Sequence, residues 1–253
     1  MSRNRLSSVA RAARLLKLFT TKTPSWGVSE LARATGQSTS TVHRLAATLA
    51  DEGLLEQDAE TGRYRLGLAL FDMAAAVPTH RSLHEAVMMP MTELRHRSGE
   101  TVQVGVLDGR QVVYVERLDG PNTLRFFVEL GRRNHAHCTG SGKVLLANLA
   151  PARRAQLLRG WELPELTSHT ITSTDDLVRE LTSVRRRGYA ENRHESEIGV
   201  CSIAAPIRDS TDSCVAAMSV AGPIERIDGQ RDALVDAVTY FARLASRQLG
   251  AQH

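Results

Sequence analysis

The chain has 253 residues, of which 42% are hydrophobic and 24% charged, a composition typical of folded globular proteins rather than disordered or fibrous ones. Its formal charge of +4 is unevenly distributed, because residues 1–50 hold eight basic side chains and one acid, Glu30, whereas residues 51–253 hold 24 basic and 27 acidic side chains. Such a basic end predicts a polyanionic partner. No apolar run approaches the roughly 20 residues of a membrane span, and no signal peptide is evident. Three cysteines without C-x-x-C spacing argue against a disulfide framework or a cysteine zinc site. We therefore expect a soluble cytoplasmic protein.

Three helices are predicted in the first 52 residues. Apolar side chains recur at helical spacing from Val9 to Phe19 and should face the core, and this helix should end before the first proline. A second helix is expected over residues 28–34, followed by a tight turn in which Gly36 adopts a positive φ. The third helix should run from Gln37 to about Glu52, with a buried stripe formed by Val42, Leu45, Ala46 and Leu49.

The other face of the third helix is rich in small hydroxyl groups. Short serine and threonine side chains let a DNA backbone approach closely and can bond to phosphates, and Arg44 is long enough to reach a phosphate or a base edge. Such a face can also be merely solvated, as in many small helical domains. The candidate DNA contacts on this helix are Ser38, Thr39, Ser40, Thr41, His43 and Arg44.

A β-hairpin is predicted directly behind the third helix. Strands are expected over residues 53–57 and 62–66, joined by a turn over 58–61, and Arg63 and Arg65 should give the hairpin a basic tip. A basic hairpin in this place is a wing, which would lie along the DNA backbone or in the minor groove. The first part of the chain is therefore predicted to be a winged helix–turn–helix that binds double-stranded DNA.

These blocks resemble the DNA-binding domain of the IclR family of bacterial transcriptional regulators. The resemblance is carried by Ser29-Glu30-Leu31-Ala32 with Thr35-Gly36, Ser40 to Leu45, Gly53-Leu54-Leu55, and Thr61 to Gly67. It implies a winged helix–turn–helix domain over residues 1–67, a linker helix over 68–78, and a GAF-like domain over 79–253 that binds an effector. It also implies dimers through the N-terminal domains and often tetramers through the C-terminal ones.

The pattern in the rest of the chain predicts an α+β domain. β-branched residues on both sides of Asp108-Gly109 indicate a β-hairpin. Further strands are expected over 202–207 and 215–220. Helices are expected over 68–76, closed by Val77-Pro78, and over 80–98, 174–187 and 227–248, with another beginning at Ser141. The predicted architecture is an antiparallel sheet flanked by helices.

Two clusters in this domain raise the question of enzyme or metal chemistry. Gly140-Ser141-Gly142-Lys143 is similar to part of a phosphate-binding loop, but His137 and Val144 stand where that motif needs a glycine and a hydroxyl. His135, His137 and Cys138 lack metal-ligand spacing, and no oxyanion signature supports a cysteine nucleophile. We therefore predict no catalytic residue, no metal and no cofactor, and keep a Cys/His enzyme as the less favoured alternative.

The C-terminal blocks resemble the effector domain of the same family. They are His137 to Ala147, Gly188-Tyr189-Ala190, Glu195, Gly199-Val200, Ile203 to Ile207, Ala216 to Val220, and Gly222-Pro223. The resemblance implies a pocket lined by Gly140, Ser141, Asn192, Ser202, Ser219 and Ala221. Asn192 stands where the family typically has an aspartate, and the loss of that anion favours an acidic ligand. A glycine-rich turn at a helix N-terminus also offers N–H groups to a carboxylate.

We therefore expect a regulator that binds a pseudo-palindromic operator and whose affinity for DNA responds to a small organic or aromatic acid. Such coupling requires that the ligand prefer one of two arrangements of the DNA-binding pair. Two other interpretations stay open. The C-terminal domain can serve only to assemble dimers or tetramers, and the polar residues of the implied pocket can merely satisfy hydrogen bonds at the edge of the sheet.

Overall fold

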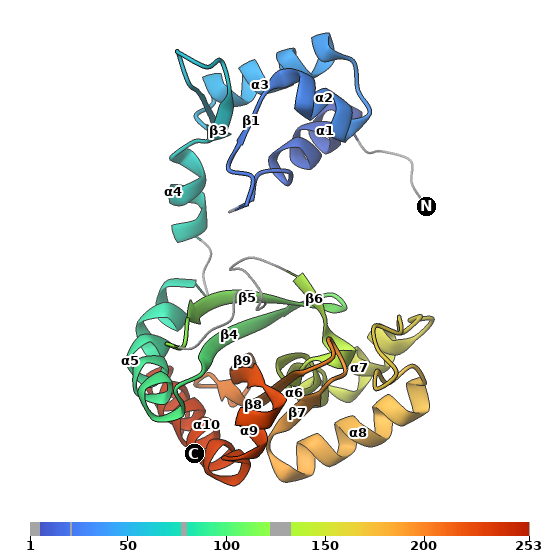
Figure 1. Cartoon of the computed structure of the whole chain (residues 1–253), viewed down its shortest axis with the longest axis vertical. Helices are drawn as coiled ribbons and strands as arrows, with labels where there is room; N and C mark the ends of the chain where they lie inside the picture. The colour runs from blue at the N-terminus through green and yellow to red at the C-terminus, as the bar shows by residue number, and fades with distance from the viewer. Residues whose placement is uncertain (1–5, 21, 77–79, 122–132, 253) are drawn as a thin grey trace. The chain divides into compact units, whose positions relative to one another are not determined.

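A computed structural model describes residues 6–20, 22–76, 80–121 and 133–252 (Figure 1). The chain divides into two compact units, Met1–Arg81 and Ser82–His253, each built around its own apolar core. Within the described ranges, no helix is both long and apolar enough to cross a lipid bilayer. The predicted end of the linker helix at Val77-Pro78 lies outside the described residues.

The N-terminal unit is a helix–turn–helix followed by a β-hairpin. Its elements are α1 (Ser7–Leu16), β1 (Ser25–Trp26), α2 (Val28–Thr35), α3 (Thr39–Asp51), β2 (Leu55–Gln57), β3 (Tyr64–Leu66) and α4 (Ala69–Ala75). The three strands form an antiparallel sheet in the order β1-β3-β2. The predicted winged helix–turn–helix is confirmed, with the addition of β1, which is too short to show a period in the sequence.

The core of this unit fixes the angle between its helices. The elements α1, α2, α3 and β3 each contribute an almost completely buried side chain to this core. These are Leu15, Leu31, Val42 and Tyr64. The predicted inward position of Val9 is wrong, because its side chain is 62% exposed and only the second half of α1 packs on the core.

The turn between α2 and α3 has the geometry that the sequence predicts. Gly36 ends α2 with φ 65°, a left-handed conformation that costs glycine little, and its N–H bonds the carbonyl of Arg33. Ser38 then caps α3 by accepting a hydrogen bond from the N–H of Thr41 at 3.3 Å. These two residues set where α2 ends and α3 begins.

The C-terminal unit is an α+β domain with one large sheet. Its elements are α5 (His80–Ser98), β4 (Thr101–Asp108), β5 (Gln111–Leu118), β6 (Arg133–His135), a 3-10 turn (Ala136–Cys138), α6 (Gly140–Asn148), α7 (Pro151–Leu158), α8 (Thr174–Arg187), β7 (Ala190–Arg193), β8 (Val200–Arg208), β9 (Cys214–Pro223), α9 (Ile224–Asp228) and α10 (Arg231–Gln248). The six strands lie in the order β6-β5-β4-β9-β8-β7, and all neighbours are antiparallel. The predicted fold class is therefore confirmed.

Helices cover both faces of this sheet (Figure 1). One face, with Val104, Ile203 and Met218, packs against apolar residues of α5 and α10. The other face, with Ala204 and Ala217, packs against α6 and α8. The second core does not extend over the whole face, because polar side chains follow these alanines along the same strands.

Candidate functional site

The first turn of α3 presents a cluster of hydroxyl groups. The Oγ of Ser38 lies 2.8 Å from the Oγ1 of Thr41 and 3.2 Å from the Oγ of Ser40. Ser38, Thr39 and Ser40 are exposed, and Thr41 is half-buried. The cluster therefore sits at the positive end of the helix dipole, where a phosphate is favoured.

Arg44 and His43 stand one turn further along the same helix. Both side chains are exposed, whereas Val42 and Ala46 on the opposite face of α3 are fully buried in the core. Within the described part of the chain, the guanidinium of Arg44 makes no hydrogen bond and no ion pair. A rigid helix thus holds an unpaired arginine beside the hydroxyl cluster, which is the geometry needed for contacts to a duplex.

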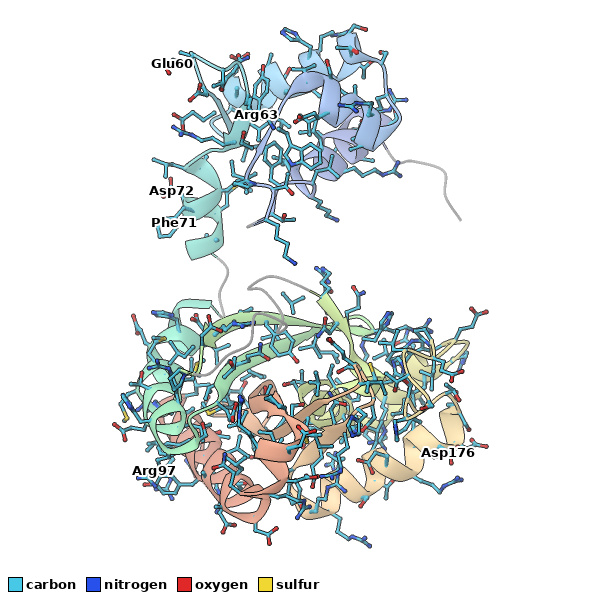
Figure 2. All side chains as sticks on the ribbon, viewed as in Figure 1. Glu60, Arg63, Phe71, Asp72, Arg97 and Asp176 are labelled. Carbon is cyan, nitrogen blue, oxygen red and sulfur yellow. The ribbon has the colours of Figure 1, made fainter. Side chains whose placement is uncertain are left out.

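Arg63, predicted as a wing contact, is turned into the domain. Its guanidinium donates to both carboxylate oxygens of Glu30 at 2.7 and 3.3 Å, and to the hydroxyl and carbonyl of Ser25 at 2.8 and 3.0 Å. Figure 2 shows Arg63 directed toward the helices, while Glu60 lies at the outer end of the hairpin. The N–H of Gly27 and then Arg63 lower the pKa of Glu30. The Arg63–Glu30 pair ties β3 to the start of α2.

Arg65 is also paired inside the hairpin. It donates to Glu56 on the neighbouring strand at 2.8 and 3.1 Å, and this exposed pair lowers the pKa of Glu56. The turn itself is held by Asp58, which accepts bonds from the backbone N–H groups of Glu60 and Thr61. The predicted basic tip is therefore wrong, because the tip carries acids and both arginines are already bound to carboxylates. Whether either arginine contacts DNA stays a prediction.

The strand register brings polar residues of the C-terminal unit onto one face. Thr101 of β4 is opposite Ala221 of β9, Ala221 is opposite Ser202 of β8, and Ser202 is opposite Asn192 of β7. Residues directly opposite each other in an antiparallel pair share a face. All four are buried. Three predicted pocket residues thus form one row across the sheet.

The first turn of α6 lies over this row. A Cβ added at Gly140 would stand 3.0 Å from the Oγ of Ser202, which shows how closely the helix approaches β8. A Cβ at Gly142 would stand 2.2 Å from the carbonyl oxygen of Ala136, so only glycine lets the preceding 3-10 turn pack against α6. Thr139 caps the helix by accepting a bond from the N–H of Gly142 at 3.1 Å.

Among the described residues, three buried polar atoms on β4, β9 and the first turn of α6 have no hydrogen-bond partner. They are Nε2 of Gln103, Oγ of Ser141 and Oγ of Ser219, on side chains that are 1 to 3% exposed. Gln103 lies directly opposite Ser219 on neighbouring strands. Buried polar atoms are almost always bonded in native proteins, so three unpaired ones on β4, β9 and α6 indicate a site that is completed by something else.

Gln103 and Tyr114 are site residues that sequence reasoning missed. Burial raises the pKa of Tyr114 to about 12, and the nearby hydroxyls of Ser141 and Thr139 oppose that shift. Ser141 lies near the Tyr114 hydroxyl without completing a hydrogen bond to it. The signal for Gln103 was its place in β4, two residues after Thr101, which puts it on the same face.

Asn192 has a structural task in addition to its place in the row. Its Oδ1 accepts hydrogen bonds from the N–H groups of Glu195 at 2.9 Å and Ser196 at 3.3 Å, and its Nδ2 donates to Ser196 at 2.8 Å. The amide of Asn192 therefore holds the loop after β7, in which His194 has φ 63°.

A buried ion pair lies behind the first turn of α6. Lys143 is 2% exposed, and its Nζ is 2.5 Å from Oε1 of Glu195 and 3.6 Å from Glu180. Burial raises the pKa of Glu195, with Lys143 opposing the shift. Burial also raises the pKa of the Cys138 thiol to about 12, which keeps it protonated at neutral pH.

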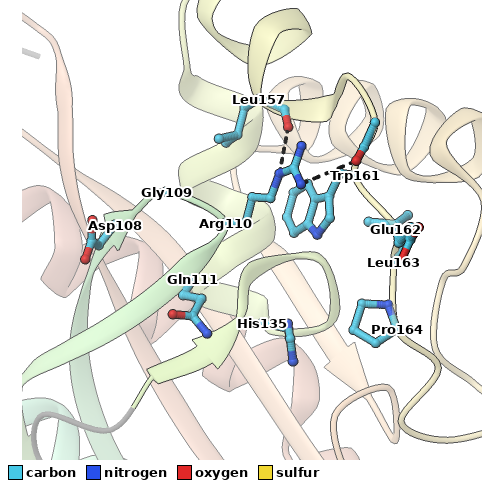
Figure 3. Close-up of a pocket in the computed structure, with 11 residues that line it drawn as sticks. Asp108, Gly109, Arg110, Gln111, His135, Leu157, Trp161, Glu162, Leu163 and Pro164 are labelled. Atoms are coloured by element: carbon cyan, nitrogen blue, oxygen red, sulfur yellow. Dashed lines mark hydrogen bonds between the residues drawn. The ribbon is translucent and has the colours of Figure 1, made fainter. Parts of the chain in front are cut away.

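A separate cavity of about 790 Å³ opens where the β4–β5 turn meets the end of α7 (Figure 3). None of the six predicted pocket residues lines it. Arg110 spans it, donating to the carbonyls of Leu157 at 3.1 Å and Arg159 at 2.8 Å, and lies over the Trp161 ring at 5.4 Å. This guanidinium caps the C-terminus of α7 and is therefore not free to bind an anion. In the described residues, no group of His, Cys, Asp and Glu could hold a metal ion.

Comparison with known proteins gives two family matches. The model described as "Bacterial transcriptional regulator IclR C-terminal" matches residues 75–247, and that of the "IclR helix-turn-helix domain" matches residues 8–59. The HTH-type transcriptional regulator XynR of Escherichia coli is 34% identical, covering 88% of each chain. The glycerol operon regulatory protein of Streptomyces coelicolor is 35% identical, covering 99% of each. A solved IclR homologue from Microbacterium hydrocarbonoxydans, complexed with 4-hydroxybenzoate, superposes with a TM-score of 0.86 at 26% identity, covering 96% of this chain and 98% of that one.

Proposed function

The chain belongs to the IclR family of bacterial transcriptional regulators, and we propose that it binds a pseudo-palindromic operator through α3 while a small carboxylic acid in the C-terminal unit sets its affinity for DNA. The family assignment makes it a regulator with a helix–turn–helix and an effector-binding domain. The observation that carries the proposal is the pair of incomplete polar surfaces, one exposed on α3 and one buried beneath α6.

The DNA-binding part of the proposal rests on Arg44 and the hydroxyl cluster of α3. In this arrangement the helix lies in the major groove, Ser38 to Thr41 bond to phosphates, and His43 and Arg44 reach base edges or the backbone. Two such units in a dimer would read half-sites about 10 base pairs apart, or a multiple of that. Arg63 and Arg65 would take part only by exchanging their carboxylate partners for phosphate.

The test uses DNA selected by the full-length protein from a random-sequence pool. Arg44→Ala should weaken binding of the selected duplex by about 10-fold or more, because a good arginine–base pairing is worth about 1–3 kcal/mol. The matched control is Arg179→Ala, which removes an exposed arginine of α8 that is paired with Asp176. Equal affinities for the Arg44 variant and the parent would refute the assignment of α3 as the recognition helix.

The effector part of the proposal rests on the unpaired atoms beneath α6. A carboxylate at the N-terminus of α6 would meet the Oγ of Ser141 and the positive end of the helix dipole. The six predicted pocket residues carry no charged side chain, so no fixed anion among them repels an acid. The related regulator that is complexed with 4-hydroxybenzoate supports an acidic ligand as well.

Isothermal titration of the full-length protein against a panel of organic acids tests this part. Saturable binding of one or more acids, lost in Ser141→Val, is the expected result. Binding of cations only, or of no acid, would refute the carboxylate. In the latter case the interpretation of the C-terminal unit as an assembly domain would be favoured.

The alternative of a cysteine enzyme gains no support from the site. A nucleophilic cysteine needs a lowered pKa, whereas burial raises that of Cys138 to about 12. The relatives named above are transcriptional regulators.

The N-terminal unit also carries apolar surface that suits a second copy of the chain. Leu6 and Val9 at the start of α1 and Leu68, Phe71 and Met73 in the α4 region are 60 to 83% exposed. Figure 2 shows Phe71 on α4. Neighbouring apolar side chains that are this exposed, as on α4, are typical of interaction surfaces. We expect Phe71→Asp to lower the mass measured by light scattering, whereas Ala59→Asp in the hairpin turn should not. An unchanged mass for the Phe71 variant would argue against dimerisation through α4.

A further inference from the structure

The amide of Gln103 is the least explained polar group in the proposed effector site. Its side chain is 3% exposed, and its Nε2 has no hydrogen-bond partner among the residues that the structure describes. It lies in the middle of β4, between β5 and β9 in the sheet, on a strand that cannot move without breaking two ladders. The amide is therefore held in place by the sheet and is directed away from the core that packs on α5 and α10.

The neighbours of Gln103 define what it faces. Ser219, directly opposite on β9, has an Oγ that is also unpaired within the described part of the chain. Side chains in such a pair have Cβ atoms roughly 5 Å apart, close enough to hold one atom between them. Two residues further along β4, Gly105 lies opposite Tyr114, whose hydroxyl is near Ser141 of α6. The sheet side of the site thus offers one amide donor and one hydroxyl, some distance from the α6 terminus.

We propose that Gln103, together with Ser219, holds a second oxygen of the effector, so that this protein selects hydroxy or oxo acids over simple acids of the same shape. This inference rests on the proposed binding of a carboxylate at α6. The nitrogen of an amide side chain is only a donor, and it therefore requires an acceptor such as a hydroxyl, carbonyl or ether oxygen. A purely apolar ligand body would leave it unpaired.

The chemistry also explains why the site should discriminate strongly. A pocket that holds a buried donor rejects the analogue lacking the matching oxygen, because the donor then stays desolvated and unpaired in the complex. The same donor is a cost to the ligand-free protein. Replacing Gln103 by leucine would remove that cost, since two apolar groups can be as stable as a hydrogen-bonded pair and more stable than a half-made one.

The experiment is isothermal titration of the full-length protein with two series of matched acids. In the first series, the simple acid propionate is compared with the oxygenated acids lactate and pyruvate. In the second series, benzoate is compared with 4-hydroxybenzoate. In at least one of the two series the parent protein should bind the oxygenated acid about 10-fold tighter or more. Gln103→Leu should abolish most of that ratio while retaining the affinity for the simple acid. The matched control is Gln111→Leu, at the start of β5, which lines the separate cavity.

Thermal unfolding without ligand distinguishes a ligand-binding amide from a structural one. Gln103→Leu should unfold at the same temperature as the parent or a higher one. A lower unfolding temperature together with equal loss of affinity for both members of a pair would show that Gln103 is structural and overturn the inference.

The two proposals fail in different ways. If simple and oxygenated acids bind the parent equally well, the role of Gln103 is refuted while the carboxylate site stands. If no acid in either series binds the parent, the carboxylate site is refuted, and this inference falls with it.

Discussion

Lys143 offers the sharpest test of the energetics beneath α6. Arginine supplies 29 of the 32 basic residues, and Lys143 is the sole lysine after residue 22. Its side chain is 3% exposed and its partner Glu195 is 10% exposed, so both charges are removed from water. A compact ammonium suits this position, whereas the planar fork of an arginine would not fit the same space. We therefore examine Lys143→Met, which keeps the length of the side chain and removes the charge.

The expected cost follows from what Glu195 would lose. In the described ranges its Oε2 has no hydrogen-bond partner, and its Oε1 accepts hydrogen bonds from Lys143 and, at 3.4 Å, from the N–H of Arg193. Glu180 keeps its bond to Arg187 at 2.8 Å, so Glu195 alone is left uncompensated. Breaking a buried pair by removing one partner typically costs about 3–5 kcal/mol. For a unit of this size that cost lowers the unfolding midpoint by roughly 6 to 20 °C.

The pH dependence has a definite sign. Burial already raises the pKa of Glu195 in the folded protein, and loss of the lysine would raise it further. A folded-state pKa above the unfolded value means that the folded protein binds its proton more tightly, so stability falls as the pH rises through the folded pKa. The deficit of Lys143→Met should therefore be smaller at about pH 5 than at about pH 8.

The assay uses a Trp26→Phe background, which leaves Trp161 as the single tryptophan and makes its fluorescence report on the C-terminal unit. Lys143→Met with Glu195→Gln should regain most of the lost stability, because the uncompensated charge is gone. A deficit below about 1 kcal/mol for the single variant, a range in which ordinary substitutions fall, or no recovery in the double variant, would refute the reasoning.

Three further predictions concern other contacts. Gly142→Ala places a Cβ 2.2 Å from a backbone carbonyl oxygen and should lower the free energy of unfolding by about 1–3 kcal/mol or more, measured by thermal unfolding. Gly229→Ala, where the nearest atom is 3.5 Å away, should lower it little, and equal effects of the two variants would contradict the packing. Arg63→Met should lower the unfolding temperature of the N-terminal unit, followed by Trp26 fluorescence, more than Arg65→Met does, because Arg63 donates four hydrogen bonds to Ser25 and Glu30 whereas Arg65 donates two to Glu56. The reverse order would contradict their assigned roles. Burial raises the pKa of all three cysteine thiols to about 12, so a thiol reagent at neutral pH should label the native protein far more slowly than the unfolded one, and rapid labelling of a native thiol would contradict it.

The elements that the sequence predicted well are those with a long period or a distinctive turn. The Asp108-Gly109 turn and the alternation around it located β4 and β5, and the glycine at 36 located the turn between α2 and α3. β1, β6 and α7 were missed because strands of two or three residues and a helix with mixed polarity show no readable period. β7 was missed because its four residues include three polar ones.

The candidate sites were harder to derive because pairing is a three-dimensional property. Nothing in the sequence shows that Arg63 bonds to Glu30, 33 positions earlier. From the sequence Arg63 was therefore predicted to contact DNA, whereas in the structure it is bound inside the domain. The same holds for Gln103, whose importance depends on what stands opposite it across the sheet. The family resemblance named Ser202 and Ala221 as pocket residues, but their alignment in one row and the unpaired atoms near them appear only once the strands are in register.

The paired arginines of the hairpin have a consequence for how operator binding should respond to ionic strength. A cation that neutralises a DNA phosphate displaces condensed counterions, and each such contact adds about 0.9 to the slope of log affinity against log salt. Arg63 and Arg65 are already neutralised by Glu30 and Glu56, so while those pairs persist they displace none. For a dimer the slope should be shallower by roughly 3.6 than the count of basic residues in the domain predicts. A regulator built in this way holds its operator more evenly as the salt of its surroundings changes.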